Sequence, residues 1–176
     1  MIDKAIIFAT NAHKGEKRKG KDMPYIFHPL EAAIIVAHMS NDESLIIAAI
    51  LHDTIEDTDV TYEEIKREFG DNIAELVQKE TEDKSKSWLQ RKAHTLERLK
   101  EETMEVKIIA MGDKLSNMRA IARDYNKQGD KLWERFNEKD KEKQSWYYKG
   151  IKVSLKELEV YPEYQEYVQL CDAIFG

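Results

Sequence analysis

The chain contains 176 residues, of which 41% are hydrophobic and 35% are charged, and its net charge is −6. These values are typical of a soluble globular protein, and we expect one domain spanning residues 1–176. The negative charge argues against a general binder of nucleic-acid polymers or anionic membranes, because both are polyanions. The single cysteine, Cys171, excludes an intramolecular disulfide. Without a signal-peptide pattern or a membrane-length apolar run, this composition favours a cytoplasmic protein.

Apolar residues recur at helical spacing along nearly the whole chain, and signals for β-strands are weak. The pattern therefore predicts an all-α protein built as a helical bundle. Pro29 suits the first turn of a helix, and a capping box at Thr61 starts a helix that Gly70 ends. The helices that we expect cover residues 3–12, 29–40, 41 or 42 to about 53, 61–69, 71 onward, about 88–100 and about 104–123, with two closing helices on either side of Pro162.

Two stretches of the second half differ sharply in polarity. Residues 104–123 are apolar on almost all sides around Val106–Met111, which predicts a central helix. Residues 126–143 are dense in charge, and there we expect only a short helix around Trp133 and Phe136 between solvated turns. Residues 82–87 read as a polar loop.

The segment His52-Asp-Thr-Ile-Glu-Asp57 directly follows the apolar run Leu45–Leu51. An imidazole and a carboxylate thus lie at the end of a segment that we expect to be buried. Ionisable groups there cost free energy unless something pairs them. A divalent metal would do so.

Two further side chains, His28 and Asp113, complete a candidate metal site, because each also lies at the edge of an apolar segment. Two imidazoles and two carboxylates suit a borderline divalent cation such as manganese, iron or zinc, whereas copper(I) and iron–sulfur clusters prefer sulfur. In the ordinary alternative, the first histidine is a hydrogen-bonded helix-start residue and the last aspartate a surface or capping residue. The four candidate ligands are His28, His52, Asp53 and Asp113.

Glu56 and Asp57 follow Asp53 by three and four residues, so they share its face if the helix continues that far. Carboxylates beside a metal-bound water can accept its proton and later donate one to a leaving oxygen. Taken without a metal, both would be ordinary acidic residues of a loop.

A basic loop precedes His28, with five positive side chains between Lys14 and Lys21. Such a loop beside a metal site fits a phosphorylated small molecule, and an arginine there can pair with phosphate or stack on a base. Asn117 lies four residues after Asp113 and could hydrogen-bond the same substrate. The ordinary alternatives are a solvated loop and a buried amide that satisfies backbone groups.

Four blocks in this order and spacing resemble the hydrolase domain of RelA/SpoT-type alarmone enzymes. They are Ala12–Lys19, Pro24–Pro29, Ala49–Thr58 and Gly112–Arg119. The resemblance implies the HD-domain fold, an all-helical bundle around one metal, usually manganese. It also implies hydrolysis of the 3′-diphosphate of guanosine tetra- or pentaphosphate with release of pyrophosphate, by a hydrolase-only member of the family.

The resemblance also assigns roles to individual residues. The family's metal ligands fall on His28, His52, Asp53 and Asp113, its acidic catalytic pair on Glu56 and Asp57, and its nucleotide contacts on Arg18, Lys19 and Asn117. The sequence departs from the family pattern at Gly20, Lys114, Ser116 and Ala120, all near where the nucleoside would lie. Two alternatives therefore remain: a phosphohydrolase of another nucleotide or phosphoester, and a sensor that binds nucleotide without hydrolysis. The oligomeric state is open.

Overall fold

The long helix α8 (Met104–Gln128) is the element around which the other helices are arranged. In the computed structural model, which describes residues 1–176, α8 packs against α2, α3, α6 and α10. There is no β-strand, so the all-α prediction is confirmed. The remaining elements are α1 (Ile2–Ala12), α2 (Phe27–Met39), α3 (Glu43–Leu51), α4 (Thr54–Asp57), α5 (Tyr62–Phe69), α6 (Asp71–Glu80), α7 (Trp88–Glu101), α9 (Lys141–Ser154), α10 (Pro162–Phe175) and the short 3₁₀ helices η1 (Gly129–Arg135) and η2 (Lys156–Leu158).

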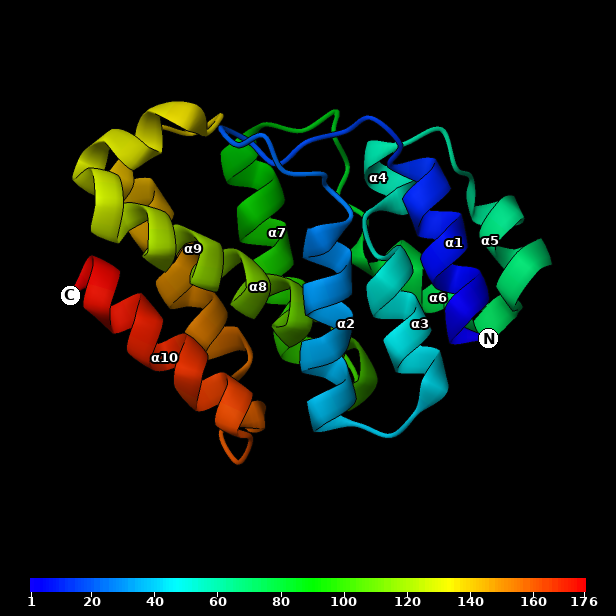
Figure 1. Ribbon diagram of the computed structural model, residues 1–176. Helices are drawn as coiled ribbons and strands as arrows, with labels where there is room; N and C mark the ends of the chain where they lie inside the picture. The colour runs from blue at the N-terminus through cyan, green and yellow to red at the C-terminus, as the bar shows by residue number, and fades with distance from the viewer.

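Figure 1 shows how these helices divide around α2 and α8. Helices α1, α3, α5 and α6 lie toward the N-terminal side of the molecule, and α9 and α10 lie on the opposite side. The loop between α1 and α2 crosses the top of the bundle and reaches the segment that follows α8. The buried apolar side chains of both sides join in one continuous cluster. No helix has the combination of length and apolar character that crossing a membrane requires.

Local capping explains most of the helix boundaries. Asp42 accepts a hydrogen bond from the Ser44 amide at the start of α3, and Thr61 and Ser87 each form a capping box. Gly70 separates α5 from α6 with a φ of 93°, a backbone conformation that glycine adopts without a Cβ clash.

Three expected boundaries differ in the structure. Helix α2 begins at Phe27, so His28 lies inside its first turn rather than before it. Helix α3 ends at Leu51, and the Thr54 hydroxyl donates to the Leu51 carbonyl at 2.7 Å, so the chain turns before α4 starts. Helix α8 runs on to Gln128, beyond the expected end near residue 123, and Gly129, with a φ of 58°, ends it.

Helices α2 and α8 approach most closely at Gly112. A Cβ atom at this position would lie 2.7 Å from the Ala32 carbonyl oxygen and 2.8 Å from Cγ2 of Val36. Only a residue without a side chain allows this contact. Because Asp113 follows Gly112 directly, the same contact sets the distance between Asp113 and the residues at the start of α2.

We predict that Gly112→Ala destabilises the protein by about 1–3 kcal/mol, because overpacking against a backbone carbonyl exceeds the gain of roughly 1 kcal/mol in helix propensity. Gly150→Ala is the matched control. The nearest atoms to its Cβ would all belong to the Leu96 side chain, with Cδ1 at 2.5 Å, Cδ2 at 2.9 Å and Cγ at 3.3 Å, and a side chain can shift more easily than a backbone carbonyl. Urea unfolding of both variants checks this, and an equal loss of stability in the two would contradict the argument.

Candidate active site

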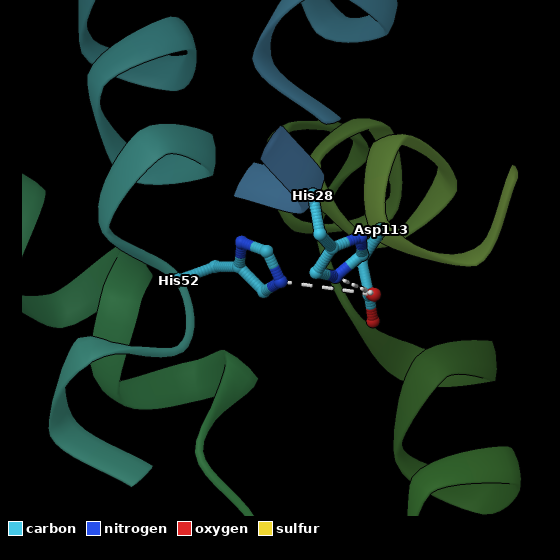
Figure 2. A group of neighbouring side chains, drawn as sticks. All are labelled: His28, His52 and Asp113. Atoms are coloured by element: carbon cyan, nitrogen blue, oxygen red, sulfur yellow. Dashed lines mark ion pairs between the residues drawn. The ribbon is translucent and has the colours of Figure 1, made fainter. Parts of the chain in front are cut away.

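Three helical segments bring a buried group of metal-ligand side chains together. His28 comes from the first turn of α2, His52 follows the last residue of α3, and Asp113 lies in the middle of α8. One ligand atom from each lies within 4.8 Å of the others, and all three residues are buried. Figure 2 shows the two imidazole rings and the carboxylate pointing toward one another. This group could hold a single metal ion.

Asp53 lies at the edge of the same group. Its Oδ2 is 2.9 Å from Nε2 of His52 and 3.5 Å from Nε2 of His28. Oδ1 of Asp113 is 3.1 Å from Nε2 of His28 and 3.7 Å from Nε2 of His52. The structure therefore brings all four ligands predicted from the sequence to one place, with Asp53 and Asp113 facing the same two imidazole nitrogens.

The second nitrogen of each imidazole is held by a hydrogen bond that orients the ring. Nδ1 of His52 donates to the Ala49 carbonyl at 2.8 Å. Nδ1 of His28 is 2.9 Å from Oγ of Ser116, whose hydroxyl donates to Glu31 at 2.8 Å, so Nδ1 of His28 is the donor to Ser116. When neutral, both rings therefore have the tautomer that ligates a metal, with the lone pair on Nε2.

The residues present fit a divalent cation. Nε2 of His52 is buried and has no hydrogen bond, although carboxylate oxygens of Asp53 and Asp113 lie close to it. A buried polar atom without a partner is costly, and a cation between the nitrogen and the carboxylates would remove that cost. Two imidazole nitrogens and two carboxylate oxygens form a donor set typical of borderline divalent metals.

The two aspartates are themselves held by neighbours. The Tyr25 hydroxyl donates to Oδ2 of Asp53 at 2.6 Å, and the Tyr25 ring packs on the ring of His13 with centroids 4.8 Å apart. Asn117 donates to Oδ1 of Asp113 at 2.6 Å, and the Lys114 ammonium pairs with Oδ2. The sequence did not indicate the role of Tyr25, because its contact with Asp53 joins residues 28 positions apart.

Burial and charge act against each other on the ionisation of this group. Burial alone would raise the pKa of Asp113, but Lys114 and the two imidazoles hold it well below its ordinary value. Burial alone would lower the pKa of His52, but the two aspartates raise it well above its ordinary value. Burial lowers the pKa of His28. Without a metal, a proton on His52 offsets the two carboxylates, and a divalent cation would take over that charge.

The predicted catalytic pair lies on α4, just beyond the turn at Asp53. Burial raises the pKa of Glu56, and its Oε2 accepts a hydrogen bond from the Glu82 amide at 3.0 Å. Asp57 is exposed and pairs with Lys84 at 2.6 Å. The two carboxylates therefore differ: Glu56 is shielded and more easily protonated, whereas Asp57 stays paired with a cation.

A cavity of about 570 Å³ opens over this group. Every site residue predicted from the sequence lines it: Arg18, Lys19, His28, His52, Asp53, Glu56, Asp57, Asp113 and Asn117. Arg18 donates to the Asn117 side chain at 2.9 Å and lies over the Tyr25 ring, which links the basic loop to α8 and to the start of α2.

Residues that the sequence did not single out as substrate contacts also line the cavity. They come from the loop before α7, from α7 itself, from the end of η1 and from α9: Lys84, Trp88, Arg91, Lys92, Arg135, Tyr147 and Tyr148. No local motif marks them, because they approach the metal-ligand group only through tertiary packing. Tyr147 and Tyr148 are buried, yet both also line the cavity.

An ion cluster holds the basic loop in place beside the cavity. The buried Asp124 of α8 pairs with Lys21 at 2.9 Å and with Arg135 at 2.7 Å. Gly20, with a φ of 72°, lies against the Arg135 side chain, where a Cβ would be only 3.0 Å from its Cδ. Gly20 is one of the departures from the family pattern. It suits this position because a side chain there would strain the loop and crowd Arg135.

Comparison with known proteins agrees with this geometry. Residues 5–140 match the model of the HD domain family. The chain belongs to the HD-domain family. A relative from Xenopus tropicalis, the guanosine-3′,5′-bis(diphosphate) 3′-pyrophosphohydrolase MESH1, is 37% identical over 126 residues, which are 70% of this chain and 70% of that protein. The resemblance to RelA/SpoT-type hydrolases is confirmed.

Two further matches extend the comparison of this HD-domain protein. A guanosine-3′,5′-bis(diphosphate) 3′-pyrophosphohydrolase of Aquifex aeolicus is 40% identical over 123 residues, which are 68% of this chain but only 18% of the longer enzyme. A crystal structure of a Listeria monocytogenes protein superimposes with a TM-score of 0.79 at 35% identity, covering 90% of this chain and 99% of that one.

We predict that Ser116→Ala weakens binding of Mn²⁺ about 10- to 100-fold, because His28 loses the acceptor that orients its ring. Ser154→Ala is the matched control, since Ser154 is also buried and donates to the Leu96 carbonyl away from the cavity. Isothermal titration of the metal-free proteins with Mn²⁺ measures both affinities. Equal affinities in the two variants would show that Ser116 does not support His28.

The ionisation of Glu80 leads to a prediction about how the free energy of unfolding depends on pH. Burial raises the pKa of its carboxyl from 4.5 to about 7, and its Oε1 has no hydrogen-bond partner. The unfolded chain ionises this carboxyl at lower pH than the folded chain, so ionised Glu80 destabilises the fold increasingly between about pH 4.5 and 7. Glu80→Gln should therefore raise the free energy of unfolding at pH 8 and much less at pH 5.

Urea unfolding in the presence of EDTA, which keeps metal binding out of the comparison, tests this expectation. Glu75→Gln is the control, because Glu75 lies on the same helix but is exposed. A gain from Glu80→Gln that is the same at both pH values would contradict the assigned shift.

Proposed function

We propose that this HD-domain protein hydrolyses guanosine 3′,5′-bis(diphosphate), and the corresponding pentaphosphate, at the 3′ position with release of pyrophosphate. The observation that carries the proposal is the convergence of His28, His52, Asp53 and Asp113 at the base of one polar cavity, with Glu56 and Asp57 on its wall. The curated relatives from Xenopus tropicalis and Aquifex aeolicus carry the name of this activity.

The metal would be held by the two imidazoles and the two aspartates, and Mn²⁺ suits this mixture of nitrogen and oxygen donors. When bound, it supplies Lewis acidity to the scissile diphosphate and to the attacking water. We propose Mn²⁺ as the native ion. The chain would act as one domain, because its buried side chains form a single cluster, and its unpaired Cys171 suits the reducing cytoplasm.

The protein's own residues would manage the proton and the substrate. Glu56 accepts the proton of the attacking water, a role favoured by its raised pKa, and returns it to the departing 3′ oxygen of the ribose. Asp57 positions the water and pairs with Lys84. Arg18 and Lys19 hold the nucleotide, and Asn117 fixes both Arg18 and Asp113.

Hydrolysis of another nucleotide is the second candidate, and one observation favours it. Two departures from the family pattern, Lys114 and Ala120, line the cavity itself. These positions lie where the resemblance places nucleoside recognition, so they would change which base and sugar the protein recognises.

We predict that His52→Ala and Asp53→Ala abolish both bound metal and turnover. Glu56→Ala should abolish turnover while the metal stays bound, because Glu56 is not among the four ligands. Pyrophosphate release from guanosine tetraphosphate with added Mn²⁺, together with the metal content of each variant, measures these effects. His38→Ala and His94→Ala, which alter exposed histidines, serve as controls.

Two results would refute parts of the proposal. Near wild-type turnover of Glu56→Ala would remove Glu56 from the reaction. If the metal-loaded wild type does not hydrolyse guanosine tetraphosphate but hydrolyses another nucleotide at a matched concentration, that result would support the second candidate. Tight nucleotide binding without any turnover would indicate a sensor.

A further inference from the structure

A chain of polar contacts leads from a candidate metal ligand on α2 to the last helix of the protein. Nδ1 of His28 donates to Oγ of Ser116 at 2.9 Å, and the Ser116 hydroxyl donates to Oε2 of Glu31 at 2.8 Å. Oε1 of Glu31 lies 3.5 Å from one terminal nitrogen of Arg119. Arg119 donates through Nε and its other terminal nitrogen to the two carboxylate oxygens of Glu166 on α10, each at 2.7 Å. These contacts join α2, α8 and α10.

The spacing of these residues along α2 and α8 places them on facing surfaces. Glu31 follows His28 by three residues, so both side chains lie on one face of α2. Gly112, Ser116 and Arg119 are separated by four and three residues, which gives them a common face of α8. Since Gly112 lies against the backbone of α2, the two faces meet. The chain of contacts therefore results from the same close approach that sets the distance between His28 and Asp113.

Glu31 determines the direction of the hydrogen bonds in this chain. A hydroxyl has one proton, and an ionised carboxylate can only accept. While the Ser116 proton points to Glu31, the Ser116 oxygen accepts from Nδ1 of His28, so the neutral ring keeps its lone pair on Nε2. Without the carboxylate, the hydroxyl is free to donate to Nδ1 of His28. The ring proton then moves to Nε2, where it blocks binding of a metal.

Arg119 and Glu166 hold Glu31 in place from the side of α10. The Glu31 and Arg119 side chains are 28% and 29% exposed, so each alone would lose rotamer freedom to keep one position. The two parallel hydrogen bonds to Glu166 fix the plane of the guanidinium. The guanidinium then faces Oε1 of Glu31 and leaves Oε2 to accept from Ser116.

We propose that Glu31, Arg119 and Glu166 are positioning residues that fix the tautomer of His28, so that α10 supports the metal-ligand group. The inference rests on the proposed function only in taking His28 as a metal ligand. It goes beyond the family, because α10 lies outside residues 5–140, the part of the chain that matches the HD domain model. It also gives a role to Ser116, a departure from the family pattern, as the link between His28 and Glu31.

The tautomer can be measured directly in the metal-free protein. Burial lowers the pKa of His28, so its ring is neutral at pH 8, and ¹⁵N NMR of labelled histidine shows which nitrogen carries the proton. The signal is assigned by its loss in His28→Gln. We expect the proton on Nδ1 in the wild type. In Glu31→Leu, which removes both carboxylate oxygens, we expect it to move mainly to Nε2.

Isothermal titration of the metal-free proteins with Mn²⁺ gives a second measurement. We expect Glu31→Leu to weaken binding about 10- to 100-fold, the usual effect of losing a residue that orients a metal ligand. Glu31→Gln keeps an oxygen that accepts from Ser116 and loses only the ion pair with Arg119. It should therefore keep the proton on Nδ1 and an affinity within about fivefold of the wild type.

Glu68→Leu is the matched control for Glu31→Leu. Glu68 lies on α5, its side chain is 32% exposed, and it pairs with Lys4 at 3.1 Å. Since it contacts none of the residues in the chain from His28 to Glu166, its loss should leave both the tautomer and the affinity for Mn²⁺ unchanged.

Glu166→Gln tests the contribution of α10. It weakens the pair that fixes Arg119, so we expect the affinity for Mn²⁺ to fall about two- to fivefold, as for a partly exposed ion pair. Asp172→Asn, on the same helix, is its control, because Asp172 pairs with Lys152 at 2.6 Å. If Glu166 acts through Glu31, then Glu166→Gln should cause no further loss in a protein that already carries Glu31→Leu.

Three results would overturn the inference. The first is an unchanged tautomer and an unchanged affinity in Glu31→Leu. The second is an equal loss in Glu31→Leu and Glu31→Gln, which would show that the acceptor oxygen is not what matters. The third is additive losses from Glu31→Leu and Glu166→Gln, which would separate α10 from His28. None of these measurements uses a substrate, so failure of the proposed hydrolysis would leave the inference standing, and failure of the inference would leave the proposed reaction untouched.

Discussion

The structure depends on the close approach of α2 and α8 at Gly112. The Ala32 carbonyl occupies the space that a side chain at this position would need, so the two helices meet backbone to backbone. One turn before Ala32, α2 carries His28, and the residue after Gly112 is Asp113, whose Oδ1 lies 3.1 Å from Nε2 of His28. A packing contact between two apolar helices thereby sets the geometry of the most polar part of the molecule.

Electrostatic balance explains why this polar part can be buried at all. Two aspartates and two histidines lie in a region from which water is largely excluded, and each is held by a partner outside the group, such as Tyr25 for Asp53 and Ser116 for His28. The remaining unsatisfied atom, Nε2 of His52, faces the carboxylates. The arrangement is more favourable with a bound cation than without one, because hydrogen bonds within the group leave that nitrogen unpaired.

The residues that line the cavity come from different parts of the chain. The N-terminal half supplies most of the metal-ligand group and the acidic pair of α4, and the C-terminal half supplies the aromatic and basic residues of α7, η1 and α9. The basic loop between α1 and α2 joins the two, because Lys21 reaches Asp124 at the end of α8 and Arg135 binds the same carboxylate. This local concentration of cations would allow a protein with a net charge of −6 to bind a polyanion.

The sequence by itself determined the helical class and most of the helix boundaries, and it predicted as metal ligands four residues that the structure brings close together. Helical periodicity and capping residues are local signals, and the ionisable residues next to apolar runs, such as His52 and Asp53 after Leu51, could be read as a site. Only the tertiary structure decided the turn that ends α3 before α4, the support of Asp53 by Tyr25 and the approach of Lys92 and Tyr147 to the cavity. These features arise from contacts between segments far apart in the chain, which no local pattern encodes.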